Sequence, residues 1–92
     1  MYIILVYDIN LEENEGKRVL RNAFKTCKKY LVHIQNSVFD GEISETGWIK
    51  REEALNIRKD VDSVIVFKSR SQTWLDKKFL GKIEKDKTDN FL

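Results

Sequence analysis

The chain has no proline, one cysteine and one histidine among its 92 residues. A lone cysteine, Cys27, cannot form an internal disulfide, so nothing indicates an oxidising compartment and we expect a cytoplasmic protein. No cysteines or histidines have the spacing of a zinc site. The apolar run at 2–7 is far shorter than the roughly 20 residues of a membrane span and lacks the basic leader of a signal peptide, so we expect no membrane partner.

Net charge is also small, because 17 basic residues nearly balance 15 acidic ones to leave +2. A balance this close does not by itself indicate a nucleic-acid partner. The distribution is more informative, since the stretch 17–29 contains no acid and concentrates positive charge. Its basic residues are Lys17, Arg18, Arg21, Lys25, Lys28 and Lys29.

Length and hydrophobicity together predict one small domain. We expect residues 1–80 to form a single domain that includes an edge strand, followed by a polar tail at 81–92. With 41% hydrophobic residues the chain can bury a core. A domain of this size still leaves much of its surface exposed, so oligomerisation would add useful burial.

Hydrophobic periodicity predicts six elements. The run at 2–7 is continuously apolar, which is typical of a central strand, whereas apolar positions in 14–30 recur at helical spacing. The inward residues of that helix would be Leu20, Ala23, Phe24, Cys27 and either Tyr30 or Leu31. The full order is a strand at 2–7, a helix at 14–30, strands at 32–39 and 42–44, a helix at 48–58 and a strand at 63–67.

This order predicts an α+β fold, a ferredoxin-like βαββαβ sandwich with both helices on one face of the sheet. The uncovered face would be a natural dimer surface. The second and third strands would meet either at an Asp40-Gly41 turn or nearer Asn36. In the second helix Trp48 and Leu55 would point inward, with Ile49 and Ala54 as further candidates and Ser44 or Thr46 as N-cap.

The segment beyond Lys68 is harder to place. Trp74-Leu75 and Phe79-Leu80 are apolar pairs in a polar stretch. They would add an edge strand or complete the sheet of a partner subunit in a homodimer. Base stacking by Trp74 and Phe79 is the less favoured alternative.

Three segments together resemble the CRISPR-associated Cas2 family. They are Val-Tyr-Asp-Ile at 6–9, the basic helix, and above all His-Ile-Gln-Asn-Ser-Val-Phe-Asp-Gly-Glu at 33–42. The stretch Asp-Ser-Val-Ile-Val-Phe at 62–67 resembles the family's fourth strand, so the likeness covers about residues 1–68. The resemblance implies a homodimer that bridges the CRISPR integrase during spacer acquisition. It also implies endonuclease activity in some members, with metal-dependent cleavage of single-stranded RNA or of DNA.

Asp8 is the strongest candidate for a catalytic and metal-binding residue. It lies where the first strand stops, so its carboxylate would be both held and accessible. Magnesium needs only one or two carboxylates plus substrate phosphates, and a twofold axis near the strand ends would pair Asp8 from both subunits. Mg²⁺ or Mn²⁺ would then activate water for phosphodiester hydrolysis. Otherwise Asp8 simply caps the following turn, but the resemblance favours the metal.

Nucleic-acid binding is predicted for the first helix. Lys17, Arg21 and Lys25 are spaced by four and would line one face, while Arg18 points to a neighbouring face. Such a stripe can follow the phosphates of RNA or DNA. An ordinary solvated helix face explains the same spacing, but the resemblance implies arginines on this helix and favours Lys17, Arg18 and Arg21.

Two interpretations remain open for Ser37 and Phe39. The resemblance implies that they lie near the dimer site, whereas a hairpin would place Asn36 and Ser37 in its turn and Phe39 in the core. For His33 we favour a structural or phosphate contact over a general base, because no residue nearby in the sequence would orient it. Cys27 is expected in the core.

Three functions stay in competition. The first is a metal-dependent endonuclease built around paired Asp8, and the second is a non-catalytic adaptor that holds the integrase and binds nucleic acid. The third is a stand-alone, toxin-like ribonuclease with the same fold. Asp8→Asn separates the first two, because it removes charge with little change in volume.

Overall fold

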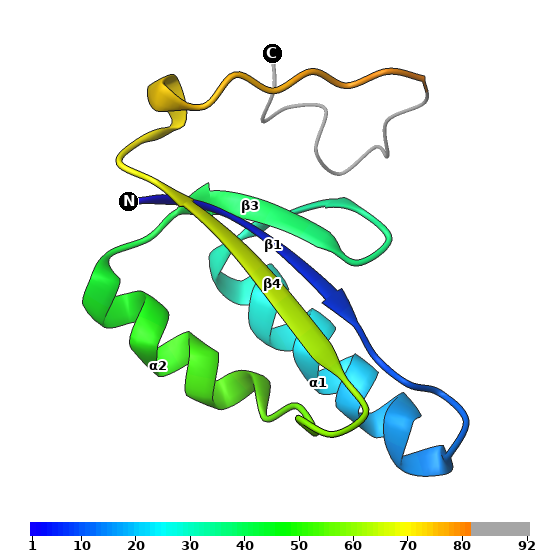
Figure 1. Cartoon of the computed structure of the whole chain (residues 1–92). Helices are drawn as coiled ribbons and strands as arrows, with labels where there is room; N and C mark the ends of the chain where they lie inside the picture. The colour runs from blue at the N-terminus through cyan, green and yellow to red at the C-terminus, as the bar shows by residue number, and fades with distance from the viewer. Residues whose placement is uncertain (82–92) are drawn as a thin grey trace.

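A computed structural model describes residues 1–81 and shows a four-stranded antiparallel sheet with two helices on one face (Figure 1). The sheet order is β2-β3-β1-β4, which confirms the predicted ferredoxin-like α+β fold. No helix in this part of the chain is long and apolar enough to cross a membrane. The elements are β1 (Tyr2–Asp8), α1 (Asn14–Tyr30), β2 (Val32–Gln35), β3 (Val38–Glu42), α2 (Glu45–Leu55), β4 (Ser63–Ser69) and the 3-10 turn η1 (Gln72–Trp74).

Strand β1 organises the core because it pairs with β3 on one side and β4 on the other. Its alternate residues Ile3, Leu5 and Tyr7 are buried against the helices. Residues of even number, including Ile4, Val6 and Asp8, therefore point to the opposite face, which neither α1 nor α2 covers (Figure 1). We call this side the open face.

Helix α1 spans the predicted residues and packs Ala23 and Cys27 into the core. Burial raises the pKa of the Cys27 thiol to about 12, as expected for a core residue. Of the two candidates at its end, Leu31 is buried, whereas Tyr30 is 39% exposed. Val19 is a buried residue that the sequence reading omitted.

Helix α2 begins earlier and ends earlier than predicted. Ser44 is the N-cap, its Oγ accepting a hydrogen bond from the Gly47 N–H at 3.0 Å. Trp48 and Leu55 are buried as expected, but Ile49 is 57% exposed, so its inward placement was wrong. Asn56 closes the helix in a left-handed conformation with φ 48°, which removes the predicted last turn to residue 58.

The hairpin between β2 and β3 turns at Asn36 and Ser37. Asn36 has φ 43°, a conformation that asparagine tolerates better than most residues. The alternative turn at Asp40-Gly41 is wrong, because Asp40 pairs with both Ile4 and Val32 inside the sheet.

After β4 the chain folds back over the open face. Lys77 forms an ion pair with Asp40 and a hydrogen bond to the hydroxyl of Tyr2, which also donates to Asp40. Burial and the Asp40 carboxylate raise the pKa of Tyr2. Within residues 70–81 the chain forms η1 but no edge strand, so the expected fifth strand is absent from the described single chain. Most of the predicted tail, 82–92, lies outside the described residues.

Candidate functional site

Asp8 ends β1 as an exposed residue on the open face, opposite Ser63 of β4. The strand before it is fixed by two neighbours, and the Tyr7 N–H donates to the Ser37 carbonyl at 3.1 Å. The carboxylate is thus attached to a rigid backbone yet open to solvent. This is the placement that the sequence predicted for Asp8.

The loop that follows Asp8 is anchored by a buried ion pair. Asp62 accepts hydrogen bonds from the Asn10 N–H at 2.9 Å and from the Arg58 Nε at 3.0 Å. Arg58 also donates from Nη2 to the Asn10 carbonyl at 2.8 Å. Both backbone groups of Asn10 are therefore held, and we call this arrangement the Arg58–Asp62 latch.

The charge of Asp62 is strongly stabilised. Hydrogen bonds from the Arg58 side chain hold the pKa of Asp62 at about 2, against an ordinary 3.8, despite the opposing effect of burial. Asp62 is only 6% exposed. The carboxylate therefore stays ionised at neutral pH and serves the loop rather than a metal.

Gly16 brings the same loop against α1. A Cβ at this position would lie 2.0 Å from the Asn10 carbonyl oxygen, which is far inside a real contact. The side chain of Asn10 accepts from the Glu12 N–H at 2.9 Å and shapes the turn. Asn10 is thus the turn residue that the sequence favoured, two positions from Asp8.

Ser37 and Arg21 lie together beside the end of β1. They line a mostly apolar hollow of about 520 Å³ with Tyr7, Phe24 and Asn36. Phe39 is fully buried and stacks on Tyr7 with ring centroids 5.9 Å apart. The hairpin interpretation of Phe39 as a core residue is therefore correct. That Ser37 and Phe39 lie near a dimer site stays a prediction, and any contribution of Phe39 would be indirect.

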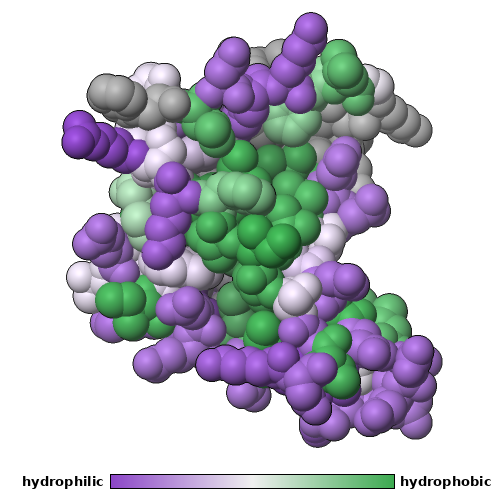
Figure 2. Space-filling model, in the orientation of Figure 1, coloured by the Kyte–Doolittle hydropathy of each residue, from purple (hydrophilic) through white to green (hydrophobic). Residues whose placement is uncertain are grey.

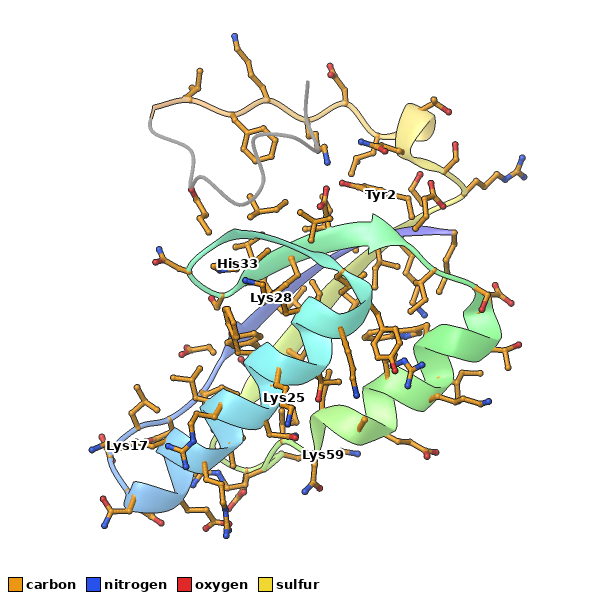
Figure 3. The ribbon with its side chains drawn as sticks, turned by 180° about the vertical axis from the view of Figure 1, so that it is seen from behind. Tyr2, Lys17, Lys25, Lys28, His33 and Lys59 are labelled. Atoms are coloured by element: carbon orange, nitrogen blue, oxygen red, sulfur yellow. The ribbon has the colours of Figure 1, made fainter. Side chains whose placement is uncertain are left out.

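The structure divides the predicted basic stripe between two sides of α1. Arg21 faces the hairpin, whereas Lys25 lines a groove toward α2 and Arg18 lines a cavity that includes Arg58. Figure 3 shows Lys28 on the side of α1 toward β2 and Lys25 on the side toward α2. Arg21 and Lys25 therefore do not form one continuous phosphate-binding stripe along a single face of α1.

His33 is held in a structural position. Its ring lies 4.9 Å from that of Phe39 and 5.0 Å from that of Phe24, measured between centroids. Nε2 is hydrogen-bonded to the Asn36 carbonyl at 2.8 Å. These contacts support the structural interpretation and give His33 no position beside Asp8.

The exposed Asp8 carboxylate fits a sparse divalent-cation site to which one chain gives a single ligand. Within residues 1–81 no three His, Cys, Asp or Glu side chains are grouped closely enough to hold a metal. Asp62 is committed to the latch, so one chain offers the Asp8 carboxylate alone. Magnesium accepts one or two carboxylates and fills its remaining positions with water and phosphate, so Asp8 suits it when a second copy contributes.

Three groups of interacting side chains were not predicted from the sequence. They are the Arg58–Asp62 latch, the buried cluster of Tyr2, Asp40 and Lys77, and Arg51 against Tyr30. The i,i+4 spacing of Arg58 and Asp62 was the one available signal. The others join residues from distant parts of the chain.

Fold and site together define a ferredoxin-like α+β domain with an exposed strand-end aspartate, and solved structures share this architecture. A protein titled as a crystal structure of cas2 aligns with a TM-score of 0.75 and 33% identity, over 91% of this chain and 90% of that one. Streptococcus pyogenes Cas2 aligns with a TM-score of 0.71 and 27% identity, over 88% of this chain and 100% of that one.

Sequence comparison identifies the family. The family model for CRISPR associated protein Cas2 matches residues 1–77. A Fusobacterium nucleatum protein named CRISPR-associated endoribonuclease Cas2 is 53% identical over 100% of this chain and 87% of its own length. A Moorella thermoacetica protein named CRISPR-associated endoribonuclease Cas2 2 is 42% identical over 98% of this chain and 100% of its own length. The chain belongs to the CRISPR-associated Cas2 family.

Proposed function

We propose that this protein is a homodimeric, metal-dependent endonuclease that acts on RNA or DNA and partners the CRISPR integrase. The observation that carries the proposal is the exposed Asp8 carboxylate at the end of β1, on the open face of the sheet. Relatives named endoribonuclease support RNA as a substrate.

The open face supports the homodimer. Ile65 is 54% exposed and Phe67 is 56% exposed, and Figure 2 shows hydrophobic side chains gathered at the centre of this face. We define the open-face patch as Ile4, Val6, Val38, Ile65 and Phe67, from their register in the sheet. An apolar patch of this kind on a small domain favours burial against a second copy.

The same face carries Asp8, so dimerisation would also complete the site. Asp8 follows Ile4 and Val6 along one face of β1. A twofold axis close to the strand end would bring two Asp8 carboxylates together. A bound Mg²⁺ or Mn²⁺ would supply Lewis acidity and an activated water for phosphodiester cleavage. The latch and Gly16 keep the backbone beside each carboxylate in place.

Nucleic-acid binding would involve the basic residues near this end of α1. Lys17, Arg18 and Arg21 are exposed, and Arg21 lies beside Ser37 and Tyr7 at the end of β1. Phosphate contacts by such residues make affinity fall steeply as salt rises. Lys25 lies on the other side of α1 and is considered below.

Cleavage of labelled single-stranded RNA and double-stranded DNA tests the nuclease. With magnesium or manganese we expect Asp8→Asn to lower the rate roughly 100-fold or more, because the variant loses the ligand charge. Asp60→Asn is the matched control, since Asp60 is an exposed aspartate on another loop. Wild-type activity that survives EDTA, or an Asp8→Asn protein as active as wild type, would leave the adaptor function.

Sedimentation equilibrium tests the dimer. We expect Ile65→Lys to shift the protein to monomer, because the charge would enter the open-face patch. Ile49→Lys is the control, since Ile49 is exposed to a similar extent, 57% against 54%, but lies on α2. A wild-type monomer, or a dimer that tolerates Ile65→Lys, would refute the use of this face.

Co-elution with the integrase of the same CRISPR locus tests the remaining part of the proposal, which rests on family membership. We expect a complex with both wild type and Asp8→Asn, since Asp8 would act in cleavage rather than in docking. Cleavage without any complex would favour a stand-alone ribonuclease. A complex without cleavage would favour the adaptor.

A further inference from the structure

A cationic groove separates α1 from α2 on the helix side of the protein, away from the open face. It has a volume of about 190 Å³ and is lined by Lys25, Lys29, Tyr30 and Arg51, among others. Figure 3 shows this side, with Lys25 on the flank of α1 that faces α2. The proposed function does not involve this groove.

Arg51 packs against the ring of Tyr30 without a hydrogen-bond acceptor for its Nε among the described residues. The Cζ atom of its guanidinium lies 3.2 Å from the centroid of the Tyr30 ring, so the two planes can stack. Its Nε is buried and donates to no acceptor. Within residues 1–81 no hydrogen bond or ion pair of Arg51 is formed, so the fork of this side chain lacks an anionic partner. A buried donor without an acceptor carries a free-energy cost, so Arg51 is not held in place by a hydrogen bond within the described part of the protein.

None of the described residues that line the groove is acidic, and the sequence of the two helices explains why. Helical neighbours three and four positions from Lys25 are Arg21, Asn22, Lys28 and Lys29. The corresponding neighbours of Arg51 are Gly47, Trp48, Ala54 and Leu55. None is acidic, although α2 contains Glu52 and Glu53, which fall outside these spacings.

The two helices are fixed to each other at this point. Asn22 donates from Nδ2 to the carbonyl of Ala54 at 3.0 Å and to that of Leu55 at 3.1 Å. These bonds occupy the Asn22 amide and set the separation of the two helices beside the groove. The three cations therefore converge on a preformed space rather than on a mobile surface.

We propose that the α1–α2 groove is a phosphate-binding site. The guanidinium of Arg51, which lies over Tyr30 and lines the groove, is the planar donor group that matches phosphate oxygens best. Lys25 and Lys29 add two positive charges at the rim. The phosphate comes from a free nucleotide or inorganic phosphate, or from the backbone of a nucleic acid that reaches the helix side.

The site is independent of the paired Asp8 carboxylates, so its test measures binding without cleavage. The Nε–H signal of Arg51 in a ¹⁵N-correlated NMR spectrum reports directly on the groove. We expect this signal to shift and saturate as inorganic phosphate is added to wild-type protein. Lys25→Gln/Lys29→Gln should weaken the binding roughly tenfold, because each exposed charge contributes a modest amount.

The matched control is Lys50→Gln/Lys59→Gln, which removes the same charge at two exposed lysines outside the groove. This control should bind phosphate as wild type does. Equal weakening in both double variants would show a general charge effect and overturn the proposal, as would the lack of a saturating Arg51 shift in wild type.

Repeating the titration with AMP and with a short single-stranded RNA separates the sources of phosphate. A saturating Arg51 shift with RNA at lower concentration than with AMP or phosphate assigns the site to a nucleic-acid backbone. Saturation by AMP or phosphate at lower concentration than by RNA assigns it to a free phosphate compound. Either pattern supports the proposal, provided that Lys25→Gln/Lys29→Gln weakens the binding and Lys50→Gln/Lys59→Gln does not.

Discussion

Replacing Asp62 by asparagine removes the charge that holds the loop after Asp8. Four donors converge on the Asp62 carboxylate at 2.9 to 3.1 Å, three from Arg58 and one from Asn10. The asparagine side chain would retain the volume of the aspartate but not its negative charge. Arg58, with a side chain only 17% exposed, would then be left without its counter-ion.

The magnitude follows from the pKa of Asp62. A fall from 3.8 to about 2 corresponds to about 2 kcal/mol of stabilisation, at roughly 1.4 kcal/mol for each pKa unit. The pKa of Asp62 is lower in the folded protein than in the unfolded chain. The stabilisation is therefore fully present at pH values well above the unfolded pKa of 3.8. It is lost as the pH falls from 3.8 towards about 2, where the carboxylate becomes protonated in the folded protein.

Urea unfolding of wild type and Asp62→Asn across a pH series measures this directly. We expect a difference in unfolding free energy of about 2 kcal/mol above about pH 5, shrinking toward zero in the acid range. Asp60→Asn, on the same loop but exposed, should show no comparable difference. A difference that does not change with pH would refute the assignment of the stabilisation to the Asp62 charge.

Two further predictions concern other close contacts in the fold. Gly16→Ala should destabilise the fold by about 1–3 kcal/mol and slow cleavage, because the new Cβ meets the Asn10 carbonyl, although alanine normally favours a helix; a urea midpoint at or above that of wild type would contradict this. Lys77→Met should cost about 3 kcal/mol, since it removes the cation beside buried Asp40, whereas Lys78→Met should be nearly neutral. Thermal unfolding compares the two lysine variants, and equal melting temperatures would contradict the role of the ion pair.

Local pattern was enough to predict α1 and β1. Apolar residues recur at helical spacing from about residue 14 to residue 30, so this periodicity alone predicts the helix Asn14–Tyr30. The hairpin was ambiguous because both Asn36 and Asp40-Gly41 have turn chemistry. Pairing with β1 decides between the two turns, because it places Val38 to Glu42 in strand β3. That pairing joins distant segments and cannot be predicted from local sequence patterns.

The candidate site shows the same limit. Asp8 was identifiable because a carboxylate directly follows an apolar strand. The groove at Arg51 was not, because Tyr30 and Arg51 lie on different helices and their approach depends on how those helices pack. The division of the basic stripe likewise depends on what covers each side of α1. Spacing of four residues alone does not reveal that.

Mixed dimers test the central claim most directly. Wild type and Asp8→Asn chains with different tags can be co-expressed, and the dimer that carries both tags isolated. If one magnesium site uses both Asp8 carboxylates, this dimer should cleave RNA or DNA hardly better than the Asp8→Asn homodimer. Half of the wild-type rate would show that each Asp8 works alone, and would contradict the paired site.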